Sequence, residues 1–247
     1  MSDTSKAILL VADISGFTKF MKQHALATSH AKQIVVRLLK SVIYASKPPL
    51  KVAELEGDAV FFYAIAPQKD VQKVTEEVKA QVVKFFAAFK RELDQINNLK
   101  TCACDACERV TDLRLKQVIH IGDIAIEKIE HFEKLFGIDV ILVHRMLKNS
   151  VPSNEYVMMT DPVYTSMKDF YGLEPERRKE SFEGVGDVET LVFYPGGMIQ
   201  KLGKADAEAA PASLAEKMAW RWQISWRTLF EFVGLKKTKG AFNNIPA

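Results

Sequence analysis

The 247-residue sequence predicts an α/β protein of the α+β kind, in which antiparallel hairpins alternate with amphipathic helices. Short apolar or alternating runs, bounded by glycine and charged residues, recur in pairs, as strands of hairpins do. Between these pairs, apolar residues repeat every three or four positions, the spacing of a helix with one buried face. Composition agrees, since 48% of the residues are hydrophobic and 26% are charged, as in a globular chain with a sizeable core.

The N-terminal half is expected to form a buried strand, two helices and a hairpin. The strand is an uninterrupted apolar run that ends near a carboxylate, Asp13, and the chain then turns at Gly16. Proline ends the second helix, because helical backbone is disfavoured before a proline. The expected elements are a strand over 7–12, helices over 17–26 and 25–45, and strands over 50–53 and 59–64 joined by the turn Glu56-Gly57-Asp58.

The following stretch is expected to contain a long helix, two more hairpins and two shorter helices. The long helix has one apolar face, and Asp161-Pro162 is a favourable helix start. Gly122-Asp123 is expected to turn the second hairpin and residues 184–187 the third. The expected elements are helices over 71–96, 138–147 and 161–170, strands over 113–121, 124–129 and 156–159, and a last hairpin over 181–194.

This pattern is interpreted as one domain over residues 1–197, a linker over 198–213 and a C-terminal helix with its tail over 214–247. The linker is alanine-rich with one proline. The amphipathic helix carries an apolar stripe with the three tryptophans of the chain and precedes a lysine-rich stretch. Such a helix either packs on the domain or across a dimer, or lies at a membrane surface. Packing onto protein is the commoner fate and is the preferred interpretation.

Charge and hydropathy exclude several classes of protein. The formal net charge of +3 is too small to favour a nucleic-acid partner. No apolar run reaches the roughly 18 residues that a membrane-spanning helix needs. The N-terminus lacks the layout of a secretory signal peptide. We therefore expect a cytoplasmic protein.

Three cysteines, Cys102, Cys104 and Cys107, lie within six positions of one expected loop. Thiolates at this spacing can share one structural Zn²⁺, and cytoplasmic chains seldom use such thiols as disulfides. A loop with free thiols explains the residues equally well. The candidates for a fourth zinc ligand are Asp105, His120 and His131.

Four motifs follow one another in the chain, and in order and spacing they resemble the motifs of class III nucleotidyl cyclases. These are Asp13-Ile14-Ser15-Gly16-Phe17-Thr18, Glu54-Leu55-Glu56-Gly57-Asp58-Ala59, Val118-Ile119-His120-Ile121-Gly122-Asp123, and Leu135-Phe136-Gly137 with Val140 and Arg145. The resemblance to this adenylate and guanylate cyclase catalytic domain covers residues 7–195 and is nearest to an uncharacterised bacterial branch. It implies a ferredoxin-like βαββαβ domain that works as a homodimer.

The resemblance also implies metal and substrate residues. Asp13 and Asp58 would bind two Mg²⁺ or Mn²⁺ ions, with the backbone carbonyl of Ile14 as a further ligand, and Phe17 and Thr18 would contact the nucleoside triphosphate. Magnesium is generally held by one or two carboxylates together with substrate phosphates. One ion lowers the pKa of the attacking hydroxyl, and the other stabilises the leaving pyrophosphate. Either aspartate taken alone is better explained as a turn residue, but the two together, in this order, favour metal binding.

Other positions of the resemblance are altered. Arg145 matches the arginine that would neutralise phosphate charge, but the transition-state asparagine falls at Ile141, which has no hydrogen-bonding side chain. The lysine that binds terminal phosphates falls at Glu183. The base-reading positions are Glu54 and Lys134, a combination that assigns no base. Loss of one such transition-state donor typically costs about 10²–10³ in rate.

Several side chains are candidates to replace the missing groups. His144 and Asn149 flank the altered helix, and Arg177, Arg178 and Lys179 precede the altered hairpin, where they equally resemble a solvated charge run. The sequence therefore leaves two functions open. The first is a metal-dependent cyclase that converts a nucleoside triphosphate to a 3′,5′-cyclic nucleotide and pyrophosphate at a homodimer interface. The alternative is a catalytically degenerate, dimeric module that binds nucleotide or metal in signalling.

Overall fold

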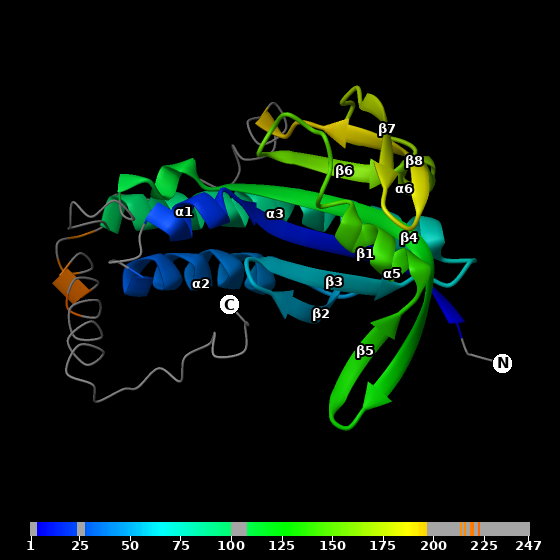
Figure 1. Cartoon of the computed structure of the whole chain (residues 1–247), viewed down its shortest axis with the longest axis horizontal. Coiled ribbons are helices and arrows are strands. Elements are labelled where there is room, and N and C mark those ends of the chain that lie inside the picture. The colour runs from blue at the N-terminus through cyan, green and yellow to red at the C-terminus, as the bar shows by residue number, and fades with distance from the viewer. Residues whose placement is uncertain are drawn as a thin grey trace.

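The computed structural model describes residues 4–23, 28–99 and 108–196, with isolated positions 213, 215, 218, 219 and 222. The described strands form one eight-stranded sheet with helices on both faces, which confirms the predicted fold class (Figure 1). The elements are β1 (Thr4–Ser15), α1 (Phe17–Gln23), α2 (Thr28–Ala45), β2 (Lys51–Glu56), β3 (Ala59–Ile65), α3 (Val71–Leu99), β4 (Arg114–Ile129), β5 (Phe132–Phe136), α5 (Ile138–Arg145), β6 (Tyr156–Thr160), α6 (Asp161–Met167), β7 (Glu176–Phe182) and β8 (Gly186–Phe193).

The sheet has the order β2-β3-β1-β4-β6-β8-β7, and β5 pairs with the far end of β4. Only β4 and β6 run parallel among these described pairs; the others are antiparallel. The central strand β1 pairs with β3 on one side and β4 on the other. The C-terminal end of β1 therefore lies beside the starts of β3 and β4, where β1 leads into α1.

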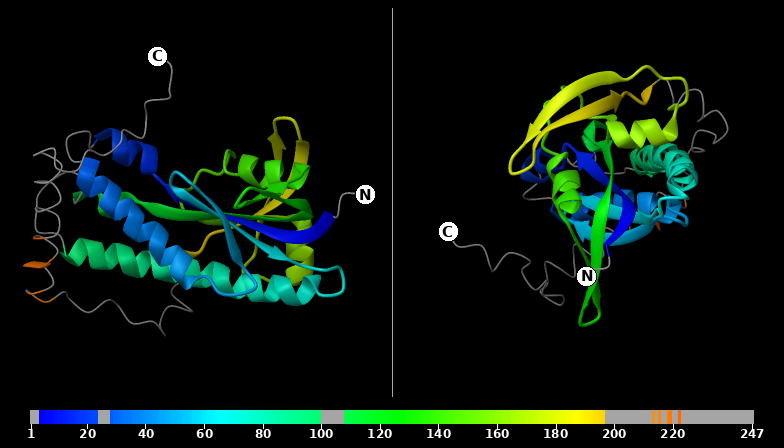
Figure 2. Two further views of the ribbon diagram at one scale, coloured as in Figure 1. Left: turned by 90° about the horizontal axis from the view of Figure 1, so that it is seen from below. Right: turned by 90° about the vertical axis from the view of Figure 1, so that its right-hand side faces the viewer.

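The two faces of the sheet carry separate apolar clusters. α2 and α3 cover one face (Figure 2, left), where Ile8 and Leu10 of β1 are fully buried. α5 packs on the opposite face with Leu9 and Val11. Because side chains alternate along a strand, Asp13 belongs to the face that α5 covers. This alternation decides where the candidate site lies.

One predicted hairpin is wrong. Gly122-Asp123 does not turn the chain, because β4 runs through it as a continuous strand of 16 residues. The turn falls after Ile129, and β5 pairs back along residues 125–129. These paired residues, 125–136, form a narrow extension of the sheet that leaves the body of the domain, here called the β4–β5 arm (Figure 1).

Other elements differ from the expectation only in length. β1 and α3 are longer than predicted, α5 and α6 are shorter, and β7 begins at Glu176 instead of residue 181. The cysteine loop and the linker lie outside the described residues, as does the C-terminal helix apart from its isolated positions. Within the described chain, no helix has both the length and the apolar character needed to cross a membrane.

Candidate functional site

Two carboxylates and one lysine meet where β1 and β4 adjoin the β2–β3 hairpin. Asp13 lies opposite Ala59 in β3 and opposite Lys116 in β4. Lys116 Nζ lies 3.0 Å from Asp13 Oδ2, and both side chains are largely buried, with 19% and 14% of their surface exposed. The carbonyl oxygen of Asp58 accepts a hydrogen bond from the backbone N–H of Ile14 at 3.1 Å. The structure thus brings together the two predicted metal ligands.

The charges of Asp13 and Asp58 favour the binding of a cation between them. Burial and then the neighbouring Asp13 carboxylate raise the pKa of Asp58 to about 6, whereas Lys116 lowers it only partly. Each carboxylate therefore disfavours the charge of the other, and a bound divalent ion would relieve that repulsion. Among the described residues, no three His, Cys, Asp or Glu side chains lie close enough together to hold a metal ion by themselves, at this site or at any other. A two-carboxylate site is the kind that suits Mg²⁺ held also by substrate phosphates.

The other residues of the first motif lie beside this pair. Ile14 is buried, and its backbone connects β1 to the Asp58 turn. Gly16 has φ +89°, a conformation that favours glycine, and its carbonyl begins α1 by accepting from the Phe20 N–H. Phe17 packs partly against the core, while Thr18 is exposed. The start of α1 therefore leaves Thr18 exposed, five residues after Asp13 in the chain.

The α5 residues of the fourth motif form a second group. Arg145 Nη1 donates to Glu183 Oε2 at 2.7 Å, so the predicted phosphate arginine is paired with the glutamate that stands in the position of the phosphate-binding lysine. Ile141 is 48% exposed on the same helix. The structure therefore brings Arg145 and Glu183 together, in an arrangement that partly neutralises the arginine.

The two predicted base-reading residues also contact each other. Lys134 Nζ on β5 lies 2.5 Å from Glu54 Oε2 on β2, and about half of each side chain is exposed. Both therefore come from one subunit and from neighbouring strands. As a pair they present one hydrogen-bond acceptor group and one donor group to the same region of solvent.

The side chains considered as replacements have partners of their own. His144 Nδ1 lies 3.1 Å from Glu56 Oε2, and Asn149 donates to the Tyr156 hydroxyl at 2.7 Å. Each basic residue of the 177–179 run pairs with a nearby acid. These pairs are Arg177 with Asp161, Arg178 with Glu176 and Glu180, and Lys179 with Asp187.

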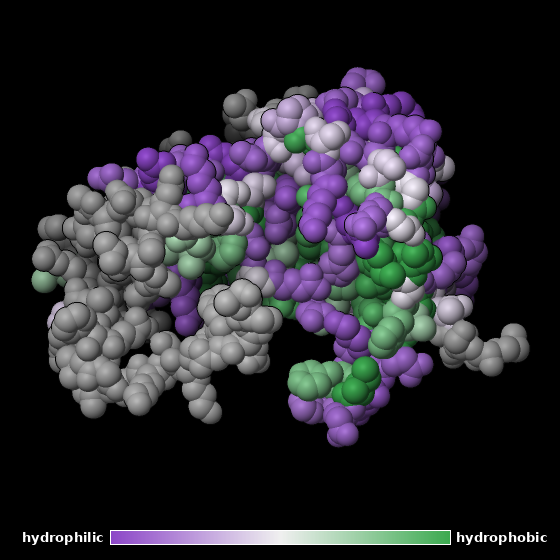
Figure 3. Space-filling view, in the orientation of Figure 1, coloured by the Kyte–Doolittle hydropathy of each residue, from purple (hydrophilic) through white to green (hydrophobic). Residues whose placement is uncertain are grey.

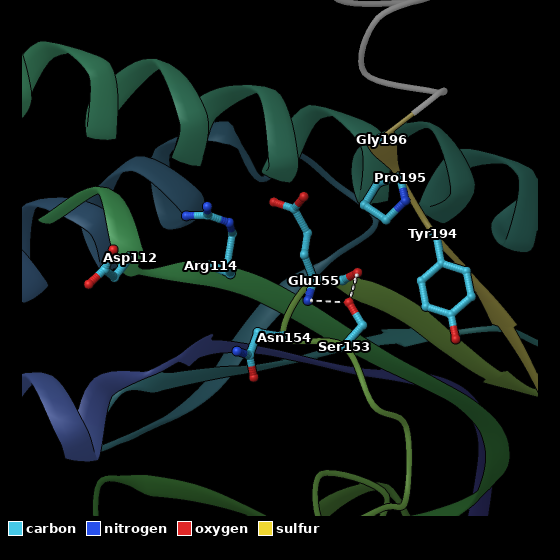
Figure 4. A pocket seen from close by; sticks show the side chains of 8 residues that line it. All are labelled: Asp112, Arg114, Ser153, Asn154, Glu155, Tyr194, Pro195 and Gly196. Atoms are coloured by element: carbon cyan, nitrogen blue, oxygen red, sulfur yellow. Dashed lines mark hydrogen bonds between the residues drawn. The ribbon is translucent and has the colours of Figure 1, made fainter. Parts of the chain in front are cut away.

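A polar pocket of about 440 Å³ lies apart from these groups, at the starts of β4 and β6. Figure 4 shows the Arg114 and Glu155 side chains pointing into the same space, with Pro195 on the opposite wall. Burial raises the pKa of Glu155, and the charges of Arg114 and Lys90 oppose that effect. None of the predicted site residues lines this pocket.

Sequence reasoning missed Lys116. The available signal was a lysine four residues before His120 in the same strand, and therefore on the same face. The role of Lys116 depends on the register between β1 and β4, because that register places Lys116 opposite Asp13. His120, considered as a zinc ligand, is instead hydrogen-bonded to Thr160 and Asp139.

The chain matches a family model and a sequence relative. Residues 35–156 match a family model described as "Protein of unknown function (DUF2652)". An uncharacterised protein of Mycobacterium tuberculosis is 33% identical over 213 residues, which are 85% of this chain and 94% of that protein.

Solved structures with a similar fold include an adenylyl cyclase and a cyclase-like ATP-binding protein. The adenylyl cyclase CyaB of Pseudomonas aeruginosa has a TM-score of 0.58 at 13% identity, covering 77% of this chain and 95% of that one. A class III adenylyl cyclase-like ATP-binding protein of the same organism has a TM-score of 0.54 at 17% identity, covering 66% and 35%. At these identities the likeness shows the fold alone.

Proposed function

We propose that this chain, which belongs to the same family as the uncharacterised mycobacterial protein, is a nucleotidyl cyclase of low turnover. Two copies would bind a nucleoside triphosphate with Mg²⁺ or Mn²⁺ between them and convert it to a 3′,5′-cyclic nucleotide and pyrophosphate. The observation that carries this proposal is the partly buried group of Asp13, Asp58 and Lys116 on a cyclase-type fold.

Each residue of that group has a chemical role in the proposal. Asp13 and Asp58 would hold the ions, with the Ile14 carbonyl as a further ligand, and Thr18 and Phe17 would lie beside the phosphates. The bound ions would supply activation of the attacking hydroxyl and charge neutralisation at the leaving pyrophosphate. Lys116 would turn from Asp13 toward a terminal phosphate, supplying a cation that Glu183 does not. Arg145 of the second subunit would approach the phosphates from the opposite side.

The proposed dimer rests on an exposed apolar surface around α5 and along the β4–β5 arm, where Figure 3 shows hydrophobic side chains gathered. Contiguous apolar surface of this kind marks an interaction site more often than a solvated face. Lys134 lies in the same arm, where it contacts Glu54 of β2. The residues with the exposed side chains are Leu55, Ile126, Ile129, Phe132, Phe136, Ile138 and Ile141.

Replacing Phe132 with aspartate is expected to convert the dimer to a monomer. Phe132 is 64% exposed at the end of the arm, so its loss costs the fold little, whereas a charge in an apolar interface is costly. Light scattering after gel filtration measures the change. Tyr44→Asp on α2 is the matched control, because Tyr44 is 73% exposed on another surface and its variant should stay dimeric. A dimeric Phe132→Asp variant would contradict the proposed interface.

A second function is favoured by α5. Ile141 cannot hydrogen-bond a developing charge, and Arg145 is paired with Glu183. A domain with this arrangement would bind the nucleotide and metal without turnover and would act in signalling through its dimer. The same observations predict slow catalysis if turnover occurs, since one missing donor costs about 10²–10³ in rate.

One experiment separates the two functions. The protein is incubated with each of the four nucleoside triphosphates and Mn²⁺, and cyclic product is measured by mass spectrometry, with binding measured in parallel by calorimetry. Product that disappears in Asp13→Ala and Lys116→Met variants supports the cyclase. Metal-dependent binding without product supports the binding module, and the absence of both rejects the proposal.

A further inference from the structure

A chain of hydrogen bonds, buried at its His120–Thr160 end, fastens α5 to the sheet. His120 lies between two partners: its Nδ1 is 3.0 Å from Thr160 Oγ1, and its Nε2 is 3.0 Å from Asp139 Oδ1. The other carboxylate oxygen of Asp139 accepts the backbone N–H of Asp123 at 2.7 Å. His120 is 7% exposed and Thr160 is 1% exposed. The chain, here called the α5 latch, connects β6 and β4 to the first turn of α5.

Two glycines allow this close approach. A Cβ atom at Gly122 would lie 2.2 Å from the Cβ of Asp139 and 2.4 Å from its Oδ2. A Cβ atom at Gly137, where φ is +150°, would lie 2.7 Å from the carbonyl oxygen of Asp123. Any larger residue at either position would push α5 off β4. This gives a steric reason for glycine in two of the four motifs.

The protons of the latch have a definite arrangement. Burial lowers the pKa of His120 in spite of the adjacent Asp139 carboxylate, so the ring is neutral near pH 7. A neutral imidazole has one N–H donor and one acceptor, and an ionised carboxylate only accepts. Nε2–H therefore donates to Asp139, and the Thr160 hydroxyl donates to Nδ1. Every side-chain group of the latch is then satisfied.

The order hydroxyl–imidazole–carboxylate also occurs in hydrolytic triads. Here the hydroxyl is enclosed in the sheet and donates to the imidazole, so a substrate has no access to it. The latch therefore positions α5 and does not react with a substrate. α5 has eight residues, too few for a stable isolated helix, and no side chain caps its N-terminus. Tertiary contacts such as the latch must hold it.

We propose that Asp139, held by His120 and Thr160, is a positioning residue that sets the placement of α5 on β4 and thereby of Arg145 at the nucleotide site. The second half of this inference rests on the proposed function. Asp139 and Arg145 are six residues apart, about 9 Å along a helix, so a tilt at the latch displaces the guanidinium. Positioning errors of about 1 Å already matter for a reacting group.

The first test is independent of nucleotide. Asp139→Ala is expected to increase amide hydrogen exchange over residues 138–145 about tenfold, because the helix loses its attachment. Asp161→Ala is the matched control, since Asp161 is also in the first turn of a short helix, and it should leave α5 unchanged. Unchanged exchange over 138–145 in Asp139→Ala would overturn the inference.

Asp139→Asn provides a variant that keeps the fold. Its amide oxygen can accept from Asp123 while its NH₂ group donates to His120 Nε2, so the ring proton moves to Nδ1 and Thr160 becomes the acceptor. Nitrogen NMR of the labelled imidazole is expected to report the Nε2–H tautomer in the wild type and the Nδ1–H tautomer in Asp139→Asn. The same tautomer in both proteins would contradict the assigned contacts.

A double-mutant cycle tests the effect on Arg145. Arg145→Ala should weaken Mn²⁺-dependent nucleotide binding about tenfold in the wild type, as expected for a charge-assisted phosphate contact. In Asp139→Ala it should have less than about a twofold effect, because the two residues act together. Additive effects would overturn the positioning role. If the wild type binds no nucleotide, the proposed function is wrong, whereas hydrogen exchange and NMR still decide whether the latch places α5.

Discussion

Replacing Asp58 with asparagine is expected to stabilise the fold at pH 7 while abolishing Mn²⁺-dependent nucleotide binding. The pKa of Asp58 is raised to about 6 by burial and by Asp13, so its charged form is disfavoured in the folded chain. Asparagine keeps the shape and removes the charge. For a partly solvated group we expect about 1 kcal/mol after allowing for screening, or about 2–4 °C in Tm for a chain of this size.

The pH dependence of this effect has a defined sign. The folded chain binds the Asp58 proton more tightly than the unfolded chain, so its stability contribution is full at low pH and is lost as the pH rises through about 6. The Tm difference between Asp58→Asn and the wild type should therefore be small below about pH 4, near the ordinary pKa of aspartate, and largest at pH 7. Thermal unfolding across this range measures it.

Mn²⁺ is expected to change the Tm of the wild type but not that of Asp58→Asn. Mn²⁺ should raise the Tm of the wild type, because ligands that bind only the folded chain stabilise it, and should leave Asp58→Asn unchanged. Glu77→Gln is the control, since Glu77 is an exposed carboxylate on α3, away from the site. A wild type that Mn²⁺ does not stabilise, or an Asp58→Asn variant that Mn²⁺ stabilises equally, would argue against the metal site.

The double variant Ile141→Asn, Glu183→Lys is expected to increase cyclic nucleotide formation by about 10²-fold or more. Asparagine supplies the donor and acceptor that isoleucine lacks, and lysine supplies the phosphate cation. Glu183→Lys also frees Arg145 from its ion pair. Ile141 is 48% exposed, so the change opens no cavity, and exposed ion pairs contribute at most about 1 kcal/mol to folding.

Initial rates with Mn²⁺ and each triphosphate, measured by mass spectrometry, test this gain. Tyr44→Asn is the control, because Tyr44 is 73% exposed on α2, outside both the proposed site and the proposed dimer surface. Its rate should equal that of the wild type. A double variant that binds the nucleotide with metal and forms no more product than the wild type would show that α5 does not supply the missing chemistry.

Much of the fold could be predicted from local patterns. Apolar runs predicted β1 and β3, and helical spacing predicted α2 and α3, because these elements bury a face whose period is visible in the chain. The turn predicted at Gly122-Asp123 was wrong, since a glycine can mark either a turn or a close packing contact. Only Asp139, seventeen residues later in the chain, decides between these two uses.

By itself, the sequence predicted the fold class, and the resemblance of its motifs to those of class III cyclases indicated the candidates Asp13, Asp58 and Arg145, since each motif is a local stretch of the chain. Tertiary structure alone decided the partners: Lys116 opposite Asp13, Glu183 beside Arg145, and Asp139 against Gly122. Each pair joins residues from separate elements, so its existence depends on strand register and helix placement. Those depend on how both faces of the sheet pack, which no single stretch of sequence contains.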